Sequence, residues 1–445
     1  MPVFDFFAEF TSTAGARPWL SAALAANQYD YARQKPSSSS SRPILHALAV
    51  NFTPYPSLTT TSKSAAVHPP SPVQMPLEII LAIIEAAYDP DTPDTRLLQS
   101  CALVCRAWST HVQKLLFKTV SLRTASAYTA FRRAVSTRPV LRDAVRRLRV
   151  VMDYSQPSYL PQHAFAHAVA MCPGLVDLDL ALYGYSEPGT EALGSLESHR
   201  LRRRAPSFDA ETISILRNGP SIRSLSFSNW SENQQCIFQL LDLYPTTLHS
   251  LSLSGTAPPP PPFPNDKPCF PGALERLRIN YQTPPSIEFM SWLLADSQRH
   301  ASLRSLAFAR EPCPDLLQFL MDAFGRDLRC LALPSCGTAE HARAIEACSA
   351  LEVLRMDRPQ LNPLAYKSVP AAIRHLALGV ERDTPLQPVI DVVKTRRELE
   401  CVTVRLWSGG EGHRLLPALR IACAYRGVEL RVTRDSGLYR ALSVS

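Results

Sequence analysis

The chain has 445 residues, of which 46% are apolar and 19% are charged, and its formal net charge is +8. This length exceeds what one compact core can organise, so we expect several domains or an elongated array. The composition is that of a globular protein, and the lack of any run of 18 apolar residues predicts no membrane span. The first ten residues include two acids and no basic cluster, which argues against a secretory signal. We therefore expect a protein of the cytoplasm or the nucleus.

The cysteines and the arginine clusters are consistent with that expectation. The eleven cysteines lie mostly singly and form no paired Cys-x-x-Cys framework, so we interpret them as small buried hydrophobic residues of a reducing compartment. Arginines gather at Arg202–Arg204 and between Arg142 and Arg149. Such clusters can attract nucleic acid. No aromatic stacking residues accompany them, however, so a solvated outer face is the better interpretation.

Residues 1–72 predict a disordered leader. This segment contains the serine run Ser37–Ser41 and many prolines within a stretch rich in Thr and Ser. Such a composition cannot bury enough apolar surface to offset the entropy of ordering the chain. The four phenylalanines between Phe4 and Phe10 offer a short amphipathic anchor as the alternative.

Residues 73–118 predict a small helical module. Pro76 stands where a helix tolerates proline, in its first turn. Turn-forming residues over 89–94 end this first helix, and a second helix is expected from 95 to 112. The apolar face of the first helix would consist of Ile79, Ile80, Ile83, Ile84 and Ala87.

From Phe117 to Leu430 one short pattern recurs about a dozen times: an apolar residue, two spacers, an apolar residue, one spacer and an apolar residue. The central apolar residues of neighbouring units are mostly 22–30 positions apart, which indicates a stacked solenoid. A gap of 47 positions between Leu178 and Leu225 predicts an insertion. The clearest units begin at Leu175, Ile222, Leu248, Leu274, Leu303, Leu328, Leu351, Ile373 and Leu399.

Each unit predicts a strand, a loop and an amphipathic helix, so the fold class is α/β. Parallel strands this close in sequence stack into a curved sheet with helices on the convex face. The solenoid would span 117–435, and 436–445 would form a tail. The run Pro258–Pro262 is interpreted as a rigid loop, with a docking motif as the alternative. Helices are expected at 126–136, 160–171, 232–243, 286–296, 314–324, 338–348, 386–396 and 412–425.

The concave face of this solenoid is where we expect a partner to bind. Side chains alternate along a strand, so the apolar residues of each unit point into the core and the spacers point to the concave face. Arginine is frequent among those spacers, which gives the face a basic tilt. The candidate substrate-facing residues are Arg223, Arg276, Arg278, Arg304, Arg355 and Arg374.

Residues 75–118 resemble an F-box, and residues 117–430 resemble the leucine-rich repeats that often follow one. The F-box pattern opens with Leu-Pro-x-Glu and an apolar run, here Met75-Pro76-Leu77-Glu78-Ile79-Ile80, and continues to an isoleucine near Ile83. Its later hydrophobic-Cys-Arg/Lys-x-Trp cluster stands as Val104-Cys105-Arg106-Ala107-Trp108, and its closing apolar pair as Leu116-Phe117. Met75 replaces the usual leucine, which conserves volume. The repeats only rarely carry the usual Asn or Cys after their third apolar residue.

The resemblance implies a non-catalytic adaptor of a cullin–RING ubiquitin ligase. The F-box would pack on the Skp subunit, and the repeats would present a protein substrate. One alternative is a helical cap on the solenoid end, and others are a ligase-independent scaffold that only holds Skp and an RNA-binding repeat protein. The resemblance assigns Skp binding to Met75, Pro76, Glu78, Ile79, Ile80, Ile83, Val104, Cys105 and Trp108.

The sequence offers no catalytic or cofactor-binding motif. It has no glycine-rich phosphate loop and no Gly-x-Ser-x-Gly nucleophile elbow. His163 and His167 are four residues apart but lack the glutamate of a metalloprotease. Cys101 and Cys105 share a predicted helix face without a second ligand pair, which favours buried packing. We therefore expect no enzymatic activity, no cofactor and no metal.

Overall fold

The computed structural model describes residues 75–88, 94–184, 205–231, 233–260, 269–359 and 362–441. The predicted leader, the Arg202–Arg204 cluster and the last two prolines of the Pro258–Pro262 run lie outside the described residues. The chain divides into two compact units, residues 1–116 and 117–445. Each unit is described by itself.

The described part of the first unit contains three helices, α4 (Leu77–Ala86), α5 (Thr95–Val104) and α6 (Arg106–Lys118), and the last two residues of α6 belong to the second unit. Pro76 precedes α4 in an extended conformation. The Asp94 carboxylate accepts a hydrogen bond from the backbone N–H of Leu97 at 2.9 Å and so caps α5. The single helix expected from 95 to 112 was wrong, because the backbone of Cys105 is extended and separates α5 from α6.

A small apolar core holds these helices together. Five side chains are buried, one from α4 and two each from α5 and α6: Ile84, Leu98, Ala102, Val112 and Leu115. Ile80, Tyr88, Cys101, Trp108 and Leu116 pack against them as partly buried residues. Because chains of about forty residues bury too little surface to be stable without additional support, this core is marginal by itself.

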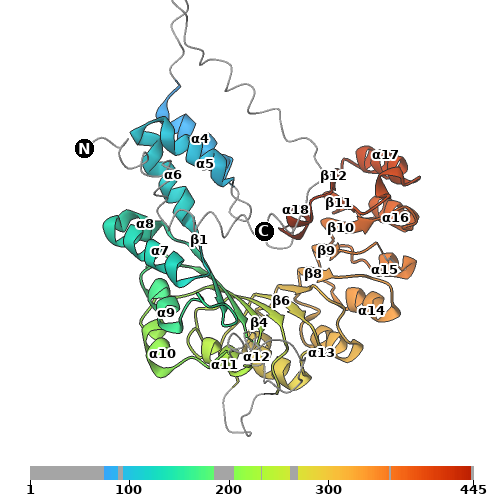
Figure 1. The fold of residues 1–445 in the computed structure, drawn as a ribbon. Helices are drawn as coiled ribbons and strands as arrows, with labels where there is room; N and C mark the ends of the chain where they lie inside the picture. The colour runs from blue at the N-terminus through green and yellow to red at the C-terminus, as the bar shows by residue number, and fades with distance from the viewer. Residues whose placement is uncertain are drawn as a thin grey trace, which may run out of the picture. The chain divides into compact units, whose positions relative to one another are not determined.

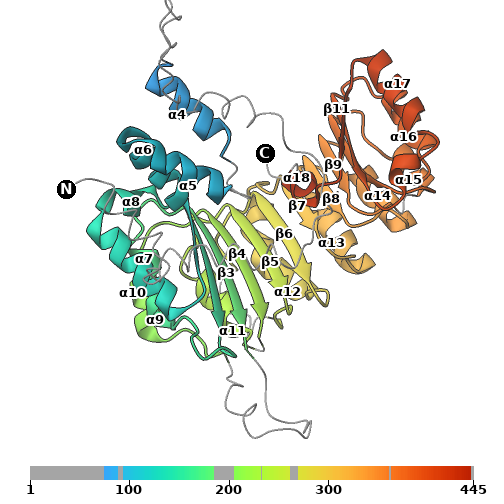
Figure 2. The same cartoon turned by 45° about the horizontal axis from the view of Figure 1, so that its top comes forward.

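The second unit is a single sheet of twelve parallel strands whose spatial order follows the chain order. Within this unit the strands line the inner face of an arc and the helices cover the outer face (Figures 1 and 2). The predicted leucine-rich-repeat-type solenoid is confirmed. The strands are β1 (Thr119–Leu122), β2 (Arg147–Asp153), β3 (Asp177–Tyr183), β4 (Ser224–Trp230), β5 (Ser250–Gly255), β6 (Arg276–Tyr281), β7 (Ser305–Phe308), β8 (Cys330–Leu333), β9 (Val353–Met356), β10 (His375–Val380), β11 (Cys401–Leu406) and β12 (Glu429–Thr433).

The register of the sheet follows the sequence pattern. The central apolar residue of each unit pairs with that of the next, so that Leu178 pairs with Leu225 and Leu225 pairs with Leu251. A slip of one residue would turn this apolar row toward solvent, which is why the pattern fixes the register. The 47-residue gap therefore leaves the register intact.

The helices of the second unit agree with the expected positions where they are long enough to show a period. Helices α8, α10, α15 and α18, of five to eight residues, were not among the expected helices, because short segments give a weak helical period; α11, with seven residues, was nevertheless expected. The helices are α7 (Ala125–Thr137), α8 (Pro139–Ala144), α9 (Gln162–Ala170), α10 (Ala210–Arg217), α11 (Gln235–Leu241), α12 (Ile287–Arg299), α13 (Pro314–Phe324), α14 (Ala339–Ala347), α15 (Pro363–Lys367), α16 (Gln387–Thr395), α17 (Leu416–Arg426) and α18 (Ser436–Ala441).

One turn at the end of β4 requires a glycine in the next strand. The buried Asn229 side chain accepts hydrogen bonds from the backbone N–H and hydroxyl of Ser231 and donates to the carbonyl of Asn233 at 2.8 Å. Gly255, paired with Asn229, has φ +93°, and a Cβ there would lie 1.9 Å from the Asn229 carbonyl oxygen. No other residue fits this close approach without moving the backbone.

Candidate functional site

Exposed apolar side chains gather on the first unit. Of thirteen large apolar side chains that are exposed among the described residues, six belong to the short stretch from residue 75 to 104. Scattered single apolar residues are normal on a protein surface, whereas a concentration of them marks a binding site. The six are Met75, Leu77, Ile79, Ile83, Leu103 and Val104.

Helix α4 divides its isoleucines between two faces. Ile80 and Ile84, four residues apart, pack toward the core of the unit. Ile79 and Ile83, also four residues apart, are each 50% exposed. The expectation that all four share one face was wrong, because successive residues on a helix are about 100° apart and each pair forms its own row. The outer row is the part of α4 that is open to a partner.

The end of α5 carries the second exposed group. Leu103 is 55% exposed, Val104 is 61% exposed and Cys105 is exposed as well. Trp108, one turn into α6, instead packs on the core. The predicted Skp-binding residues therefore fall into two sets: Ile80 and Trp108 support the fold, and Met75, Pro76, Glu78, Ile79, Ile83, Val104 and Cys105 are exposed.

On the second unit, the six arginines of the candidate substrate face lie in different environments. Arg276 and Arg278 are spacers of β6 and are exposed and half-buried, respectively. Arg355, a spacer of β9, is only 3% exposed and lies 3.1 Å from the Asp357 carboxylate. The other three were expected on the concave face but lie outside the strands: Arg223, Arg304 and Arg374 each precede a strand by one residue, at the amino-terminal ends of β4, β7 and β10.

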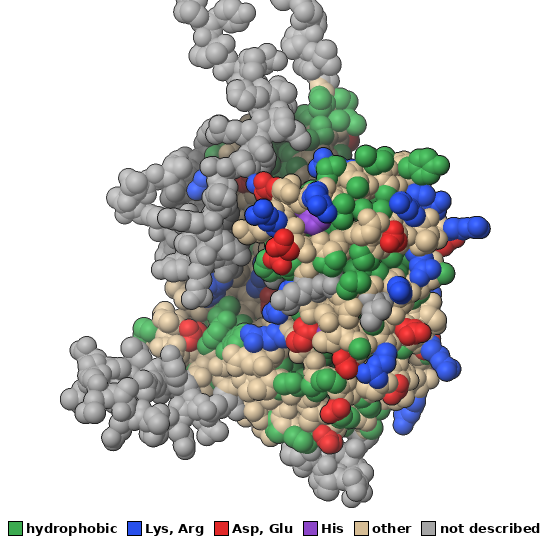
Figure 3. Space-filling model, turned by 90° about the vertical axis from the view of Figure 1, so that its right-hand side faces the viewer, with side chains coloured by type: hydrophobic (Ala, Val, Ile, Leu, Met, Phe, Trp, Pro, Cys, Tyr) green, Lys and Arg blue, Asp and Glu red, His purple; other side chains and the backbone are tan. Residues whose placement is uncertain are grey.

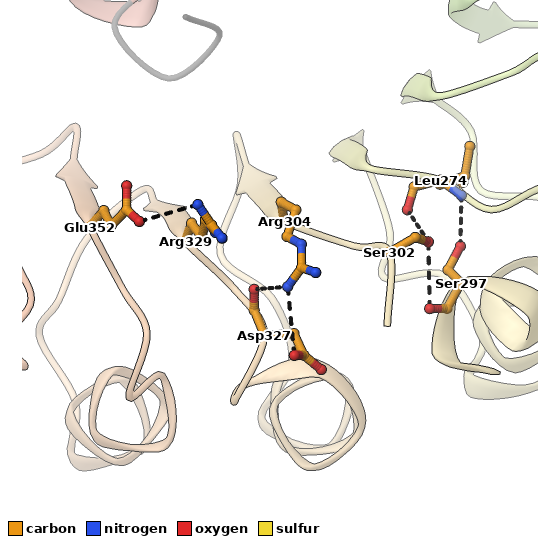
Figure 4. A network of polar contacts seen from close by, with 7 residues as sticks. All are labelled: Leu274, Ser297, Ser302, Arg304, Asp327, Arg329 and Glu352. Atoms are coloured by element: carbon orange, nitrogen blue, oxygen red, sulfur yellow. Dashed lines mark hydrogen bonds and ion pairs between the residues drawn. The ribbon is translucent and has the colours of Figure 1, made fainter. Parts of the chain in front are cut away.

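Contacts of these three residues connect successive repeats at the amino-terminal ends of the strands. The Arg223 carbonyl accepts hydrogen bonds from the backbone N–H groups of His249 and Ser250 in the next unit, at 2.9 and 3.1 Å. Arg304 reaches the Asp327 carboxylate at 3.6 Å and carbonyl at 3.2 Å (Figure 4). Arg374 lies 3.8 Å from Glu400. Exposed ion pairs of this kind contribute about 0–1 kcal/mol each, so they add little to the stability of the stacked repeats.

The first half of the concave face is accessible and begins with two ion pairs. Arg147 of β2 lies 3.4 Å from Asp177 of β3, and Arg149 lies 3.8 Å from Asp179. Burial among neighbouring side chains raises the pKa of Asp179, although Arg149 and the hydroxyl of Ser226 oppose that shift. The charges of β2 and β3 thus largely offset each other.

The C-terminal helix packs against the concave face beside the last strands of the sheet. Helix α18 lies beside β11 and β12, on the opposite side of the sheet from α16 and α17 (Figure 1). The fully buried Tyr439 donates a hydrogen bond to the carbonyl of Met356 at 2.8 Å, and the Arg405 guanidinium lies 5.9 Å from its ring. Burial raises the pKa of Tyr439 well above its ordinary value, so the phenol remains a neutral donor. The predicted tail over 436–445 thus includes a packed helix.

The predicted absence of a metal or nucleophile remains an expectation. No group of three or more His, Cys, Asp and Glu side chains is close enough to hold a metal within the described ranges. His163 and His167 are both exposed on α9. Cys101 is half-buried and burial raises the pKa of its thiol, whereas Cys105 is exposed and was wrongly expected to be buried.

The side of the second unit that bears α14 to α17 has a mixed surface. Basic, acidic and apolar side chains are interspersed there, without a single-sign stripe (Figure 3). Helix α17 adds the exposed Ile421 and Tyr425. A mixed surface of this kind is typical of a solvated outer face.

Comparison with known proteins adds no family. No protein-family model matches the sequence, and no curated protein is recognisably similar to it. In the part of the chain that the structure describes, no helix is long and apolar enough to cross a membrane. The features that bear on function are the exposed apolar side chains of the first unit and the concave face of the second unit.

Proposed function

We propose that this chain is a non-catalytic adaptor of a Skp–cullin–F-box ubiquitin ligase, in which residues 75–116 bind the Skp subunit and the solenoid binds a protein substrate. The observation that carries the proposal is the exposed apolar surface of the first unit. It comprises the outer row of α4, with Ile79 and Ile83, and the end of α5, with Val104 and Cys105. These are the positions at which the sequence resembles an F-box.

The physical chemistry of the first unit supports a role in binding. Among the described residues its core contains five buried apolar side chains, while other apolar residues of comparable size remain in water. An apolar helix row that is exposed at i and i+4 fits a helix-in-groove interface. Burying such side chains against a partner stabilises the complex by roughly 1.5–3 kcal/mol for each fully buried residue.

The proposal is tested by replacing the outer row of α4. We expect Ile79→Glu/Ile83→Glu to lower Skp affinity about 100-fold or more, because charged side chains would be placed in a desolvated interface where anchors contribute 2 kcal/mol or more each. The measurement is calorimetric titration of the purified full-length chain with a Skp subunit. Both substituted residues are half-exposed in the free chain, so the fold should persist.

A matched control uses the same helix. Glu85→Gln replaces an exposed polar residue of the same helix, and it should change Skp affinity by less than a factor of two. Circular dichroism of both variants checks the helix content. Skp binding that survives the double substitution, or deletion of residues 75–118, would refute the proposal.

The ligase role and the scaffold role differ in one further measurement. An adaptor should bring cullin into the complex through Skp, whereas a ligase-independent scaffold should hold Skp without cullin. Co-purification of the full-length chain with Skp and cullin, compared between the wild type and Ile79→Glu/Ile83→Glu, separates the two functions.

A further inference from the structure

The last strands of the second unit form a site for a tyrosine, which the chain fills with its own end. Tyr439 of α18 is fully buried, and its hydroxyl donates a hydrogen bond to the Met356 carbonyl, at the end of β9, at 2.8 Å. Its ring lies 5.9 Å from the guanidinium of Arg405, a residue of β11. We call the residues that surround this ring or act on its phenol the Tyr439 site: Arg355, Met356, Asp357, Arg405 and Trp407.

The Tyr439 site has the composition of a protein-binding surface. The Arg405 guanidinium lies 4.7 Å from the centre of the Trp407 ring, and therefore contacts two aromatic rings. A guanidinium beside an aromatic ring is an attractive cation–π arrangement. Trp407 remains 38% exposed. Trp, Tyr and Arg are the residue types most often found as energetic anchors of protein interfaces.

The neighbouring strands hold these side chains in place. Trp407 donates a hydrogen bond from Nε1 to the Asp357 carbonyl at 2.9 Å. Gly379 of β10 pairs in register with Arg405. A Cβ at Gly379 would lie 2.8 Å from Trp407 Nε1 and closer still to the Asp357 carbonyl oxygen, so a larger residue would disturb this hydrogen bond. The glycine thus keeps Trp407 beside Arg405.

Helix α18 depends on its contact with the Tyr439 site. It has six residues, and a helix this short is not stable in water by itself. Arg434, Asp435 and Gly437, which lead from β12 into the helix, are exposed. Among the α18 side chains that the structure describes, Tyr439 is the buried one and Ser436 is half-buried. Loss of the Tyr439 contact should therefore release α18 from the concave face, to which it is seen bound in Figure 1.

We propose that α18 is an intramolecular competitor, and that the Tyr439 site binds a tyrosine of a protein partner when α18 is released. The partner's phenol donates to the Met356 carbonyl and its ring lies beside Arg405, as those of Tyr439 do. Only chains with a released α18 bind the partner, so the apparent affinity is reduced by the fraction of such chains. The inference rests on the proposed function in that this partner would be the substrate.

The first test compares the wild-type full-length chain with Tyr439→Ala, which empties the site. The probe is a fluorescent peptide with the sequence of residues 434–445, and its binding is measured by anisotropy. Tyr439→Ala should bind the probe at least tenfold more tightly than the wild type, and Tyr439→Ala/Arg405→Gln should lose this gain. The matched control, Tyr425→Ala, removes an 89% exposed tyrosine of α17 and should bind the probe as weakly as the wild type.

The second test asks whether the site accepts other proteins. A display library of random ten-residue peptides is selected on full-length Tyr439→Ala. The selected peptides should be enriched in tyrosine, and phenylalanine in its place should weaken their binding. They should bind the wild type at least tenfold more weakly, because α18 competes with them.

Several outcomes would overturn the inference. These are equal probe binding by the wild type and Tyr439→Ala, an equal gain in Tyr425→Ala, or selected peptides without tyrosine. Binding of the 434–445 probe alone, with no peptide selected, would reduce α18 to a structural element. Tyr439→Phe keeps the ring and should give a smaller gain, so a result does not depend on one variant that folds poorly. Skp affinity should be the same for the wild type and Tyr439→Ala, so failure of this inference and failure of the adaptor role are distinguishable.

Discussion

At the scale of single residues, two neighbouring isoleucines of α4 differ in their environment: Ile84 packs in the core and Ile83 is exposed. Ile84 is 8% exposed and lies in the core of the first unit, whereas Ile83 is 50% exposed. The side chains are chemically identical, so any difference between their substitutions reflects position alone. Substitutions of this pair therefore distinguish an effect on folding, at Ile84, from an effect on partner binding, at Ile83.

We expect Ile84→Ala to destabilise α4 to α6 by about 2–4 kcal/mol, because it leaves a cavity in a small core. Ile83→Ala should cost less than about 0.5 kcal/mol, because its side chain is half in water, yet it should weaken Skp binding. Hydrogen exchange of the backbone amides in α4 to α6, together with Skp titration, measures both effects. Equal destabilisation by the two substitutions would contradict the assignment of faces.

At the scale of elements, polar networks fix loops and helix starts between repeats. The carboxylate of Glu311, after β7, lies 2.8 Å from His341 Nε2 in α14 and accepts hydrogen bonds from the Ser335 hydroxyl, after β8. Thr338, the residue that caps α14, contacts His341 Nδ1 at 3.1 Å. One carboxylate thus connects the segments that follow β7 and β8 with helix α14.

This network predicts an acid-sensitive contribution to stability. Burial alone would raise the pKa of Glu311, but hydrogen bonds from His341 and Ser335 and the nearby positive charges outweigh it, and the pKa is lowered below 4.5. A carboxyl whose pKa is lowered on folding stabilises the protein above its unfolded pKa, and this stabilisation is lost as the pH falls through the folded value. We expect the stability difference between wild type and Glu311→Gln to be full at about pH 6 and to shrink below about pH 4.5, as measured by urea unfolding. A difference independent of pH would contradict this role.

At the scale of the whole second unit, stability is expected to be local along the array. Each repeat of a solenoid contacts only its neighbours, so a perturbation at one end should not reach the other. Helix α18 is an exception to this sequential pattern, since Tyr439 bonds to Met356, 83 positions earlier in the chain.

Truncation after Asp435 tests this arrangement. Without α18, the Arg355 and Asp357 side chains become accessible and the last repeats lose the hydrogen bond to Met356. We expect faster hydrogen exchange in β9 to β12 and unchanged exchange in β2 to β5. Tyr439→Phe, which removes only the hydroxyl, should produce a smaller effect in the same strands. Uniform acceleration across the sheet would show that the unit unfolds as one body.

The solenoid, its strands and their register could all be predicted from the sequence pattern. The apolar triplets recur at fixed internal spacing, and a parallel sheet accepts only the register that buries all of them, so Leu178, Leu225 and Leu251 align although 47 residues separate the first two. The two-part order of a helical module and a repeat array also followed from the pattern. These features depend on local periodicity, which one sequence displays.

Which candidate side chains are accessible could not be predicted from the sequence, because it depends on packing between distant segments. Ile79 and Ile80 look equivalent in sequence, and their roles diverge because the core of the first unit covers one of them. Arg355 and Arg278 occupy the same position in their repeats, yet Arg355 is covered and Arg278 is not. On β9 to β11 the covering element is α18, from the end of the chain. A contact between segments so far apart produces no periodic pattern in the sequence. Accessibility depends on what lies above a surface, and that is set by residues far away in sequence.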